Sequence, residues 1–427
     1  MSDRRHAEVI VVGAGPAGAA TATFLARNGI EVTLVDRARF PRDKPCAEYL
    51  SPQATRLLDE LGALSAIEAA GPAQLTGMRV TAPDGTAFLG EFAARHGFRG
   101  FRDRGLALRR TVLDAILVDR AREAGAQIQE GVAVRDLVRD GAAVRGVVVT
   151  GDAHTTTLRA PLVIGADGLR SVVSRRLGLA RQGRWPRRYA VVTHYTGVAG
   201  IGPQGEMHVF ADGYAGLADV GHGVTNVAVV VPASLARDLS GDPSAFLERW
   251  LDGHAALNAR FASAQRVSPV VVTGPFNQRA ARAWAPGAAL VGDAADFFDP
   301  FTGEGIYAAL RGAELLAPYA FEVARNHADA RRAAVALAAW DRARRDEFRG
   351  KARVERLVGA AVGAPAIFTH VAHSLARRRD MADLLVGVAG DFVPPDRVLR
   401  PGFLFRLLVP GRAPDRAGDD APSSHPA

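Results

Sequence analysis

Three glycines near the N-terminus have the spacing of a loop that binds phosphate. They are Gly13, Gly15 and Gly18, and Pro16 and Ala17 complete the pattern G-x-G-x-x-G. The first glycine permits a tight turn, the second lets the backbone approach a pyrophosphate, and the third lets a helix pack closely against a strand. The N–H groups and positive dipole end of that helix favour phosphate charge. This spacing therefore predicts a dinucleotide-binding loop.

The segments around the glycines are those that such a loop requires. Residues 8–13 form an apolar run typical of a buried parallel strand, and residues 16–28 carry small and apolar side chains at helical spacing. A second strand over residues 31–36 completes a βαβ unit. Its last residue, Asp36, could accept hydrogen bonds from ribose hydroxyls, and Arg37 is the next candidate contact. This unit alone does not distinguish NAD from FAD.

Two later segments also place an aspartate and a glycine at the end of a predicted strand. They are residues 162–171, which contain Asp167, and residues 290–306, which contain Asp293. Together with the glycine loop, they resemble the para-hydroxybenzoate-hydroxylase-like FAD-dependent oxidoreductases. That superfamily includes the aromatic hydroxylases (group A flavin monooxygenases), flavin halogenases and geranylgeranyl reductases. The resemblance covers roughly residues 8–340 and favours FAD over NAD.

The resemblance implies a role for each of these two segments. Asp167 belongs to a segment that supports FAD and has been linked to binding of the nicotinamide cofactor. In the later segment, the aspartate bonds the ribityl chain, and the following helix start places a positive dipole end near the pyrimidine edge of the flavin. The candidate cofactor-binding residues of the later segment are Gly292, Asp293, Pro300, Gly303, Glu304, Gly305 and Ile306.

Four residues outside these motifs are further candidates for contact with FAD. Arg110 begins an R-x-x-L pattern that the family places at a helix start facing FAD, and Val134 matches a position whose backbone touches adenine. Either could instead be a plain surface arginine or a core valine. Arg42 and Lys44 could neutralise the pyrophosphate, because they lie in a segment that resembles one in the geranylgeranyl-reductase-like branch.

Cys46 and Glu48 in that same segment are the candidate catalytic residues. The resemblance implies that Cys46 lies near the isoalloxazine ring, although Ala47 stands where the branch usually has glycine. A lone cysteine is more often a small buried hydrophobe than a reactive thiol. Glu48 and Glu304 could relay protons, and a solvated or capping carboxylate explains each equally well.

The resemblance leaves two reactions open. In the first, FAD reduced by NADPH or NADH hydroxylates a hydrophobic aromatic or polyketide-like molecule. In the second, reduced FAD saturates a carbon–carbon double bond of an isoprenoid. Residues 299–306 and the Pro45–Cys46 pair resemble the reductase branch, but residues 213–219 replace its aromatic segment. We favour hydroxylation, and keep as a third hypothesis a flavin-binding protein without turnover.

The motif order predicts an α/β fold with three parts. A Rossmann-like FAD-binding domain of the glutathione-reductase type is interrupted by a mostly antiparallel β-sheet substrate domain and followed by a helical C-terminal region. We assign residues 1–71, 106–180 and 281–340 to the FAD-binding domain, 72–105 and 181–280 to the substrate domain, 341–411 to the helical region and 412–427 to a disordered tail.

Composition narrows the function further. The net charge of +8 comes from scattered arginines without a basic block among aromatics, so no nucleic-acid partner is expected. The single cysteine and the histidine spacing predict no metal site. No apolar run is long enough to span a membrane, so we expect a cytoplasmic monomer or homodimer with a hydrophobic small-molecule substrate. The apolar segment at residues 403–409 could still touch a membrane surface.

Overall fold

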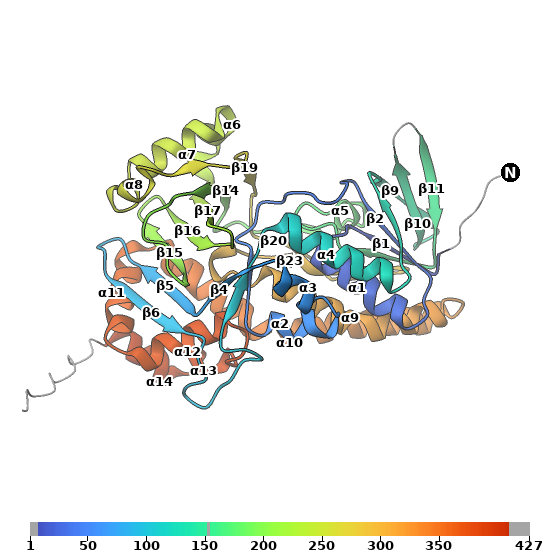
Figure 1. Cartoon of the computed structure of the whole chain (residues 1–427). Coiled ribbons are helices and arrows are strands. Elements are labelled where there is room, and N and C mark those ends of the chain that lie inside the picture. Colours follow the sequence, from blue (N-terminus) through green and yellow to red (C-terminus); the bar gives the residue numbers. More distant parts are fainter. Residues whose placement is uncertain (1–6, 152–153, 410–427) are drawn as a thin grey trace, which may run out of the picture.

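The computed structural model describes residues 7–151 and 154–409, and it has a mixed α/β fold. Two large β-sheets lie side by side, with helices around them (Figure 1). One sheet carries the glycine loop near the N-terminus. The other is built from the middle of the chain and is covered by helices from the C-terminal region. The predicted tail at residues 412–427 lies outside the described residues.

The first sheet has six strands in the order β21-β22-β12-β1-β2-β8. All neighbours are parallel except β21 and β22. The central strands are apolar along their whole length because helices and other layers cover both faces. The bounds are β1 Val9–Val12, β2 Val32–Asp36, β8 Gln127–Glu130, β12 Leu162–Gly165, β21 Trp284–Ala285 and β22 Ala288–Leu290.

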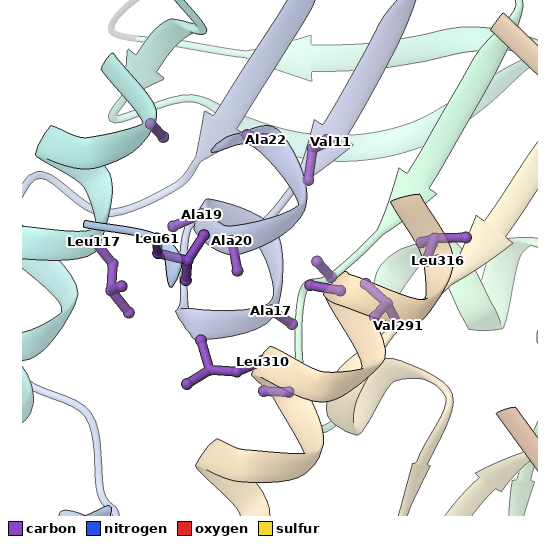
Figure 2. Close-up of a cluster of buried hydrophobic side chains, with 14 of the residues drawn as sticks. Val11, Ala17, Ala19, Ala20, Ala22, Leu61, Leu117, Val291, Leu310 and Leu316 are labelled. Carbon is purple, nitrogen blue, oxygen red and sulfur yellow. The ribbon is translucent and has the colours of Figure 1, made fainter. Parts of the chain in front are cut away.

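Helix α1 (Pro16–Arg27) joins β1 to β2 and packs against α9 (Gly305–Arg325), as Figure 2 shows. The facing side of α1 is made of small residues, so the two helices approach closely. A Cβ atom added to Gly18 would lie 1.7 Å from the carbonyl oxygen of Gly13. The third glycine of the motif therefore lets α1 start directly above the end of β1. Labelled side chains of this core include Ala17, Ala20, Val291, Leu310 and Leu316.

The second sheet runs in the order β18-β14-β17-β16-β15-β5-β6, and β19 also pairs with β14. All pairs are antiparallel except β15 with β5. The bounds are β5 Gly77–Thr81, β6 Ala87–Glu91, β14 Arg188–Thr196, β15 Gln204–Phe210, β16 Gly213–Asp219, β17 Val224–Pro232, β18 Gln265–Arg266 and β19 Val271–Thr273.

The two faces of this second sheet have different partners. One face packs against a group of short helices through residues such as Leu247 and Trp250. The opposite face packs against the C-terminal helices through Phe368 and Met381. Figure 1 shows these two helical layers above and below the sheet. The bounds are α6 Ala236–Gly241, α7 Pro243–Asp252, α8 Ala255–Phe261, α10 Ala330–Val362, α11 Pro365–Ala376, α12 Arg379–Ala389, α13 Asp396–Leu399 and α14 Pro401–Leu408.

Smaller elements complete the chain. Three three-stranded sheets have the orders β11-β10-β9, β13-β20-β23 and β3-β7-β4. Their strands are β3 Tyr49–Leu50, β4 Ala73–Leu75, β7 Gly105–Ala107, β9 Ala133–Asp140, β10 Ala143–Thr150, β11 Thr155–Arg159, β13 Ala180–Gln182, β20 Gln278–Ala280 and β23 Asp296–Phe297. The remaining α-helices are α2 Ala54–Glu60, α3 Leu64–Ala69, α4 Arg110–Glu123 and α5 Val172–Arg176. Short 3-10 turns are η1 Ala233–Leu235, η2 Gly292–Ala294 and η3 Pro300–Thr302.

The helical part of the chain after β3 is divided into two helices. Helices α2 and α3 are separated at Gly62, whose φ of +70° is the left-handed conformation that ends the first helix. In the described part of the chain, no single helix has the length and apolar character to cross a membrane. Helices α10 and α11 meet that criterion only together, across a bend of 114°.

We predict that Gly18→Ala destabilises the protein by about 3 kcal/mol or more, because the new methyl group would overlap the Gly13 carbonyl. Thermal or urea unfolding measures this loss. The matched control is Gly402→Ala, at an exposed helical glycine with no other atoms within 4 Å of an added Cβ. The control should change stability by no more than about 0.5 kcal/mol. Equal losses in both variants would contradict this account of the turn.

A candidate cofactor and substrate pocket

One pocket lies where the two large sheets face each other, and it joins segments that are far apart in sequence. Gly15 of the glycine loop and Asp293 both line it. A wall of apolar side chains from the second sheet closes one side, and α10 contributes another. The predicted site residues on its wall are Gly15, Pro16, Ala17, Lys44, Cys46, Arg110, Gly292, Asp293, Pro300, Gly303, Glu304, Gly305 and Ile306.

A buried cluster of cations stands beside the glycine loop. Arg110 at the start of α4 donates to both oxygens of Asp114, at 2.7 and 2.6 Å. Arg42 forms an ion pair with the same carboxylate at 2.8 Å. A Cβ added to Gly15 would lie 3.6 Å from Arg42 Nη2 and 3.8 Å from Arg110 Nη2. Both guanidinium groups are therefore aimed at the backbone where the motif expects a pyrophosphate.

This cluster holds more cations than anions. Arg42, Lys44 and Arg110 contribute three cations, and Asp114 and Asp293 contribute two anions. Burial lowers the pKa of Lys44, and so does Arg110, while Asp293 opposes them. Burial raises the pKa of Asp293, against the opposing effect of Lys44. Because one cation is in excess, the cluster suits an anionic ligand with two phosphates, as FAD has.

The other end of the pocket is a tight loop before α9. Gly303 has a φ of +73°, and a Cβ there would lie 2.9 Å from the ring of Tyr49. Asp299 accepts hydrogen bonds from Tyr214 Oη at 2.7 Å and from Phe301 N at 3.1 Å, and pairs with Arg188 at 2.7 Å. This buried carboxylate holds the loop against the second sheet, so the N-terminus of α9 is fixed at the pocket.

Glu48, one of the two predicted catalytic residues, is a buried link between the sheets. Its φ is +59°, and its Oε1 accepts a hydrogen bond from Arg110 N at 2.7 Å. Its Oε2 lies 2.7 Å from His194 Nε2 and accepts from Asn226 Nδ2 at 3.0 Å. The side chain does not line the pocket. Its position indicates that it holds the Cys46 segment in place.

Cys46, the other predicted catalytic residue, lines the pocket. Its sulfur accepts a weak hydrogen bond from Glu48 N at 3.4 Å, and its carbonyl oxygen accepts from Asn226 Nδ2 at 2.9 Å. Burial acts to lower the pKa of Arg110, but Asp114 and the Cys46 sulfur raise it, with a net upward shift. The thiol is thus next to a guanidinium that stays charged.

Several predicted residues lie outside the pocket wall. Asp36 accepts hydrogen bonds from Ala14 N at 2.7 Å and Ala38 N at 2.8 Å, and Arg37 is exposed. Val134 of β9 is 9% exposed and belongs to a buried apolar cluster. The other predicted cofactor-binding residues off the wall are Gly13 and Gly18, which shape the turn, Arg42 and Asp167.

Asp167 binds the start of a helix. Its carboxylate accepts hydrogen bonds from Ser171 Oγ and Val172 N, each at 2.5 Å, at the start of α5. Burial raises the pKa of Asp167, and these hydrogen bonds oppose the shift. The side chain therefore positions the segment whose next residue, Gly168, lines the pocket.

Sequence reasoning missed three groups of residues at this site. Asp114 lies four residues after Arg110 on one helix, so the i, i+4 rule could have found it. Asn226 and Arg188 carry no local signal, because their partners Glu48 and Asp299 are far away along the chain. The α10 face that lines the pocket, with Trp340, Arg344, Phe348, Lys351 and Glu355, was assigned only to a helical region.

We predict that Asp114→Asn lowers the free energy of unfolding by about 3–5 kcal/mol, because it removes the carboxylate that pairs with the buried Arg110 and the half-buried Arg42. Denaturant unfolding of the FAD-free protein measures this. Asp119→Asn on the same helix is the control, since Asp119 is 57% exposed and pairs with Arg122 at the surface. The control should lose less than about 1 kcal/mol. A small loss for Asp114→Asn would show that the guanidinium groups are solvated.

The comparisons with known proteins agree with this geometry. The model of the FAD binding domain family matches residues 6–344. Digeranylgeranylglycerophospholipid reductase 2 of Methanopyrus kandleri is 31% identical over 71% of this chain and 74% of its own length. Menaquinone reductase of Mycobacterium tuberculosis is 31% identical over 72% and 74%. The 6-methylpretetramide 4-monooxygenase of Streptomyces rimosus is 35% identical over 42% of each chain.

Solved structures share the fold at low identity. The flavin-dependent brominase Bmp2 has a TM-score of 0.79 at 20% identity, covering 94% of this chain and 97% of its own. A geranylgeranyl bacteriochlorophyll reductase-like protein from Thermoplasma acidophilum has a TM-score of 0.72 at 20% identity, covering 94% and 96%. The family match and the relatives found by sequence confirm the predicted family and an enzymatic function, and the hypothesis of a protein without turnover is set aside. The chain belongs to the FAD binding domain family and is an FAD-dependent oxidoreductase.

Proposed function

We propose that this enzyme binds FAD along the pocket and transfers electrons from NADPH or NADH to a hydrophobic small molecule. The observation that carries the proposal is that Gly15, Asp293 and the apolar wall of the second sheet line one continuous pocket. In this proposal, the six-stranded sheet belongs to a Rossmann-like domain of the glutathione-reductase type. The second sheet is the substrate domain, with the boundaries predicted from sequence.

Each end of the pocket has groups suited to one part of FAD. Arg110, Arg42 and Lys44 would hold the pyrophosphate beside the glycine loop, and Asp36 would face the adenosine ribose. Asp293 would accept hydrogen bonds from the ribityl chain, and the N-terminus of α9 would favour negative charge at the pyrimidine edge of the ring. When bound, FAD supplies electron transfer between a nicotinamide reductant and the substrate.

Hydroxylation is our first candidate for the reaction. The Streptomyces relative is a 6-methylpretetramide 4-monooxygenase, and the apolar wall of the pocket would accept a hydrophobic substrate. The protein's part in such a reaction is to keep water away from the reacting atoms and to orient the substrate. Wall residues from the second sheet are Ala190, Val192, Met207, Ala228 and Val230.

Saturation of a carbon–carbon double bond is the second candidate, and two observations favour it. Two relatives that match over more than 70% of this chain are a digeranylgeranylglycerophospholipid reductase and a menaquinone reductase. In addition, Cys46 supplies a thiol on the pocket wall, beside the Arg110 guanidinium. A thiol so placed could deliver a proton to the substrate carbon next to the one that receives hydride.

We predict that Arg110→Ala weakens FAD binding by roughly ten- to a hundredfold, since a charged hydrogen bond to phosphate is lost. Arg110→Lys should lose less, because it keeps the charge but not the planar fork. Isothermal titration of the FAD-free protein measures both, with Arg109→Ala as control. Arg109 precedes Arg110 in the chain and pairs with Asp43 at 3.3 Å near the surface. Equal affinities of the Arg109 and Arg110 variants would contradict the assigned pyrophosphate site.

The reaction type is decided by the dependence on oxygen. The FAD-loaded enzyme is incubated with NADPH and, separately, with NADH, together with 1-naphthol or with geranylgeraniol. We expect a naphthol product that contains one added oxygen atom, formed only in air. A geranylgeraniol product with two added hydrogen atoms, formed without oxygen, would instead support the second candidate. Mass spectrometry of the products distinguishes the two.

A further inference from the structure

Helix α10 forms one side of the pocket through residues that recur every three or four positions. They are Trp340, Arg344, Phe348, Lys351 and Glu355. This spacing places them on one face of the helix. Two are apolar and three are titratable, so the face is not a simple hydrophobic cover. Its charged residues lie close to carboxyl groups of the loop before α9.

Three of the four carboxyl groups in this part of the pocket have a cationic partner. Asp299 pairs with Arg188 at 2.7 Å, Glu304 with Lys351 at 3.3 Å, and Asp296 with Arg344 at 3.9 Å. Two of these cations are also shared with other carboxylates, since Lys351 contacts Asp391 and Arg344 lies 3.8 Å from Asp341. No cation of this group is left over.

Glu355 is the fourth carboxyl group, and it differs from the other three. Within residues 7–151 and 154–409, its side chain forms no hydrogen bond or ion pair, and it is on the pocket wall. Burial raises the pKa of Glu355 well above its ordinary value, and Glu304 and other acids raise it further, against the effect of Lys351. This upward shift favours the protonated form of the Glu355 carboxyl group. The charged and titratable groups around it are Lys351 and Arg344 of α10, Asp296, Asp299 and Glu304 of the loop, Arg188 of β14 and Tyr214 of β16.

A protonated carboxyl group in an apolar pocket is a hydrogen-bond donor without an internal acceptor. Leaving such a donor unpaired in a bound complex costs free energy, so a ligand that supplies an acceptor gains affinity. A ligand with a carboxylate or phosphate at this point would instead meet an excess of acids whose cations are already paired. A neutral carbonyl oxygen accepts a hydrogen bond and brings no negative charge, so it suits this position.

We propose that Glu355 is the residue that recognises the substrate, through a hydrogen bond from its carboxyl group to a carbonyl oxygen of a neutral, hydrophobic molecule such as a quinone or a polyketide. The apolar wall of the second sheet takes the rest of that molecule. The inference rests on the proposed function, because it uses the same pocket, and it adds the chemical class of the substrate. It applies to either candidate reaction on a substrate that carries a carbonyl group.

The test measures binding of 2-methyl-1,4-naphthoquinone to the oxidised, FAD-loaded enzyme, without reductant. Perturbation of the flavin absorption spectrum reports the dissociation constant, and 2-methylnaphthalene serves as the analogue without oxygen. We compare wild type, Glu355→Gln and Glu355→Leu. The matched control is Glu347→Leu, on the same helix but paired with Arg311 outside the pocket wall. FAD content is measured for every protein.

We expect Glu355→Leu to weaken quinone binding by roughly three- to tenfold, as for the loss of one neutral hydrogen bond, with no effect on 2-methylnaphthalene. Glu347→Leu should bind like wild type. Wild-type affinity should fall as the pH rises through the raised pKa of Glu355, because the ionised form no longer donates. Glu355→Gln still donates through its amide, so it should keep its affinity across that range.

Three outcomes would overturn the inference. They are unchanged quinone affinity in Glu355→Leu, the same pH dependence in Glu355→Gln as in wild type, and no binding of the quinone by the loaded wild type. If Glu355→Leu does not fold, the glutamine variant and its pH dependence still decide. A wild type that takes up no FAD contradicts the proposed function instead, so the two failures are distinguishable.

Discussion

Two buried carboxylates hold the two halves of the pocket together. Glu48 lies between the start of α4 and the strands β14 and β17, and Asp299 lies between the loop before α9 and the same sheet. Each is contacted by a cation or an imidazole and by a neutral donor. Ions are costly to bury, and they persist only where partners satisfy them from fixed directions. The loops that carry Cys46 and Gly303 are therefore fixed relative to the second sheet.

The balance of charge differs between the end of the pocket beside the glycine loop and the end beside α10. Beside the glycine loop, Arg42, Lys44 and Arg110 outnumber Asp114 and Asp293, which suits a dinucleotide. Beside α10, acids outnumber cations, which suits a neutral substrate. Between them, the apolar strands of the second sheet remove water and so strengthen every electrostatic interaction at both ends. A single pocket can thus hold a doubly anionic cofactor and an uncharged ligand.

Sequence patterns were most informative where a function needs a special backbone. Gly13, Gly18 and Gly303 occupy positions where a side chain would clash or a positive φ is required, so the residue type itself records the geometry. Apolar runs such as those of β1 and β12 indicated strands that are buried on both faces. Polar residues gave weaker signals. The carboxylate of Glu48 was interpreted as catalytic, and the structure gives it an internal set of partners.

The sequence by itself determined the family, the cofactor class and the backbone turns, because these depend on glycine positions and on the order of three local motifs. Only the tertiary structure decided which charges meet. Arg188 and Asp299 are 111 residues apart, and His194 and Glu48 are 146 apart, so no local pattern connects them. The same holds for Glu355. Its side chain lacks a partner because of how other elements pack around α10, and no sequence pattern indicates that packing.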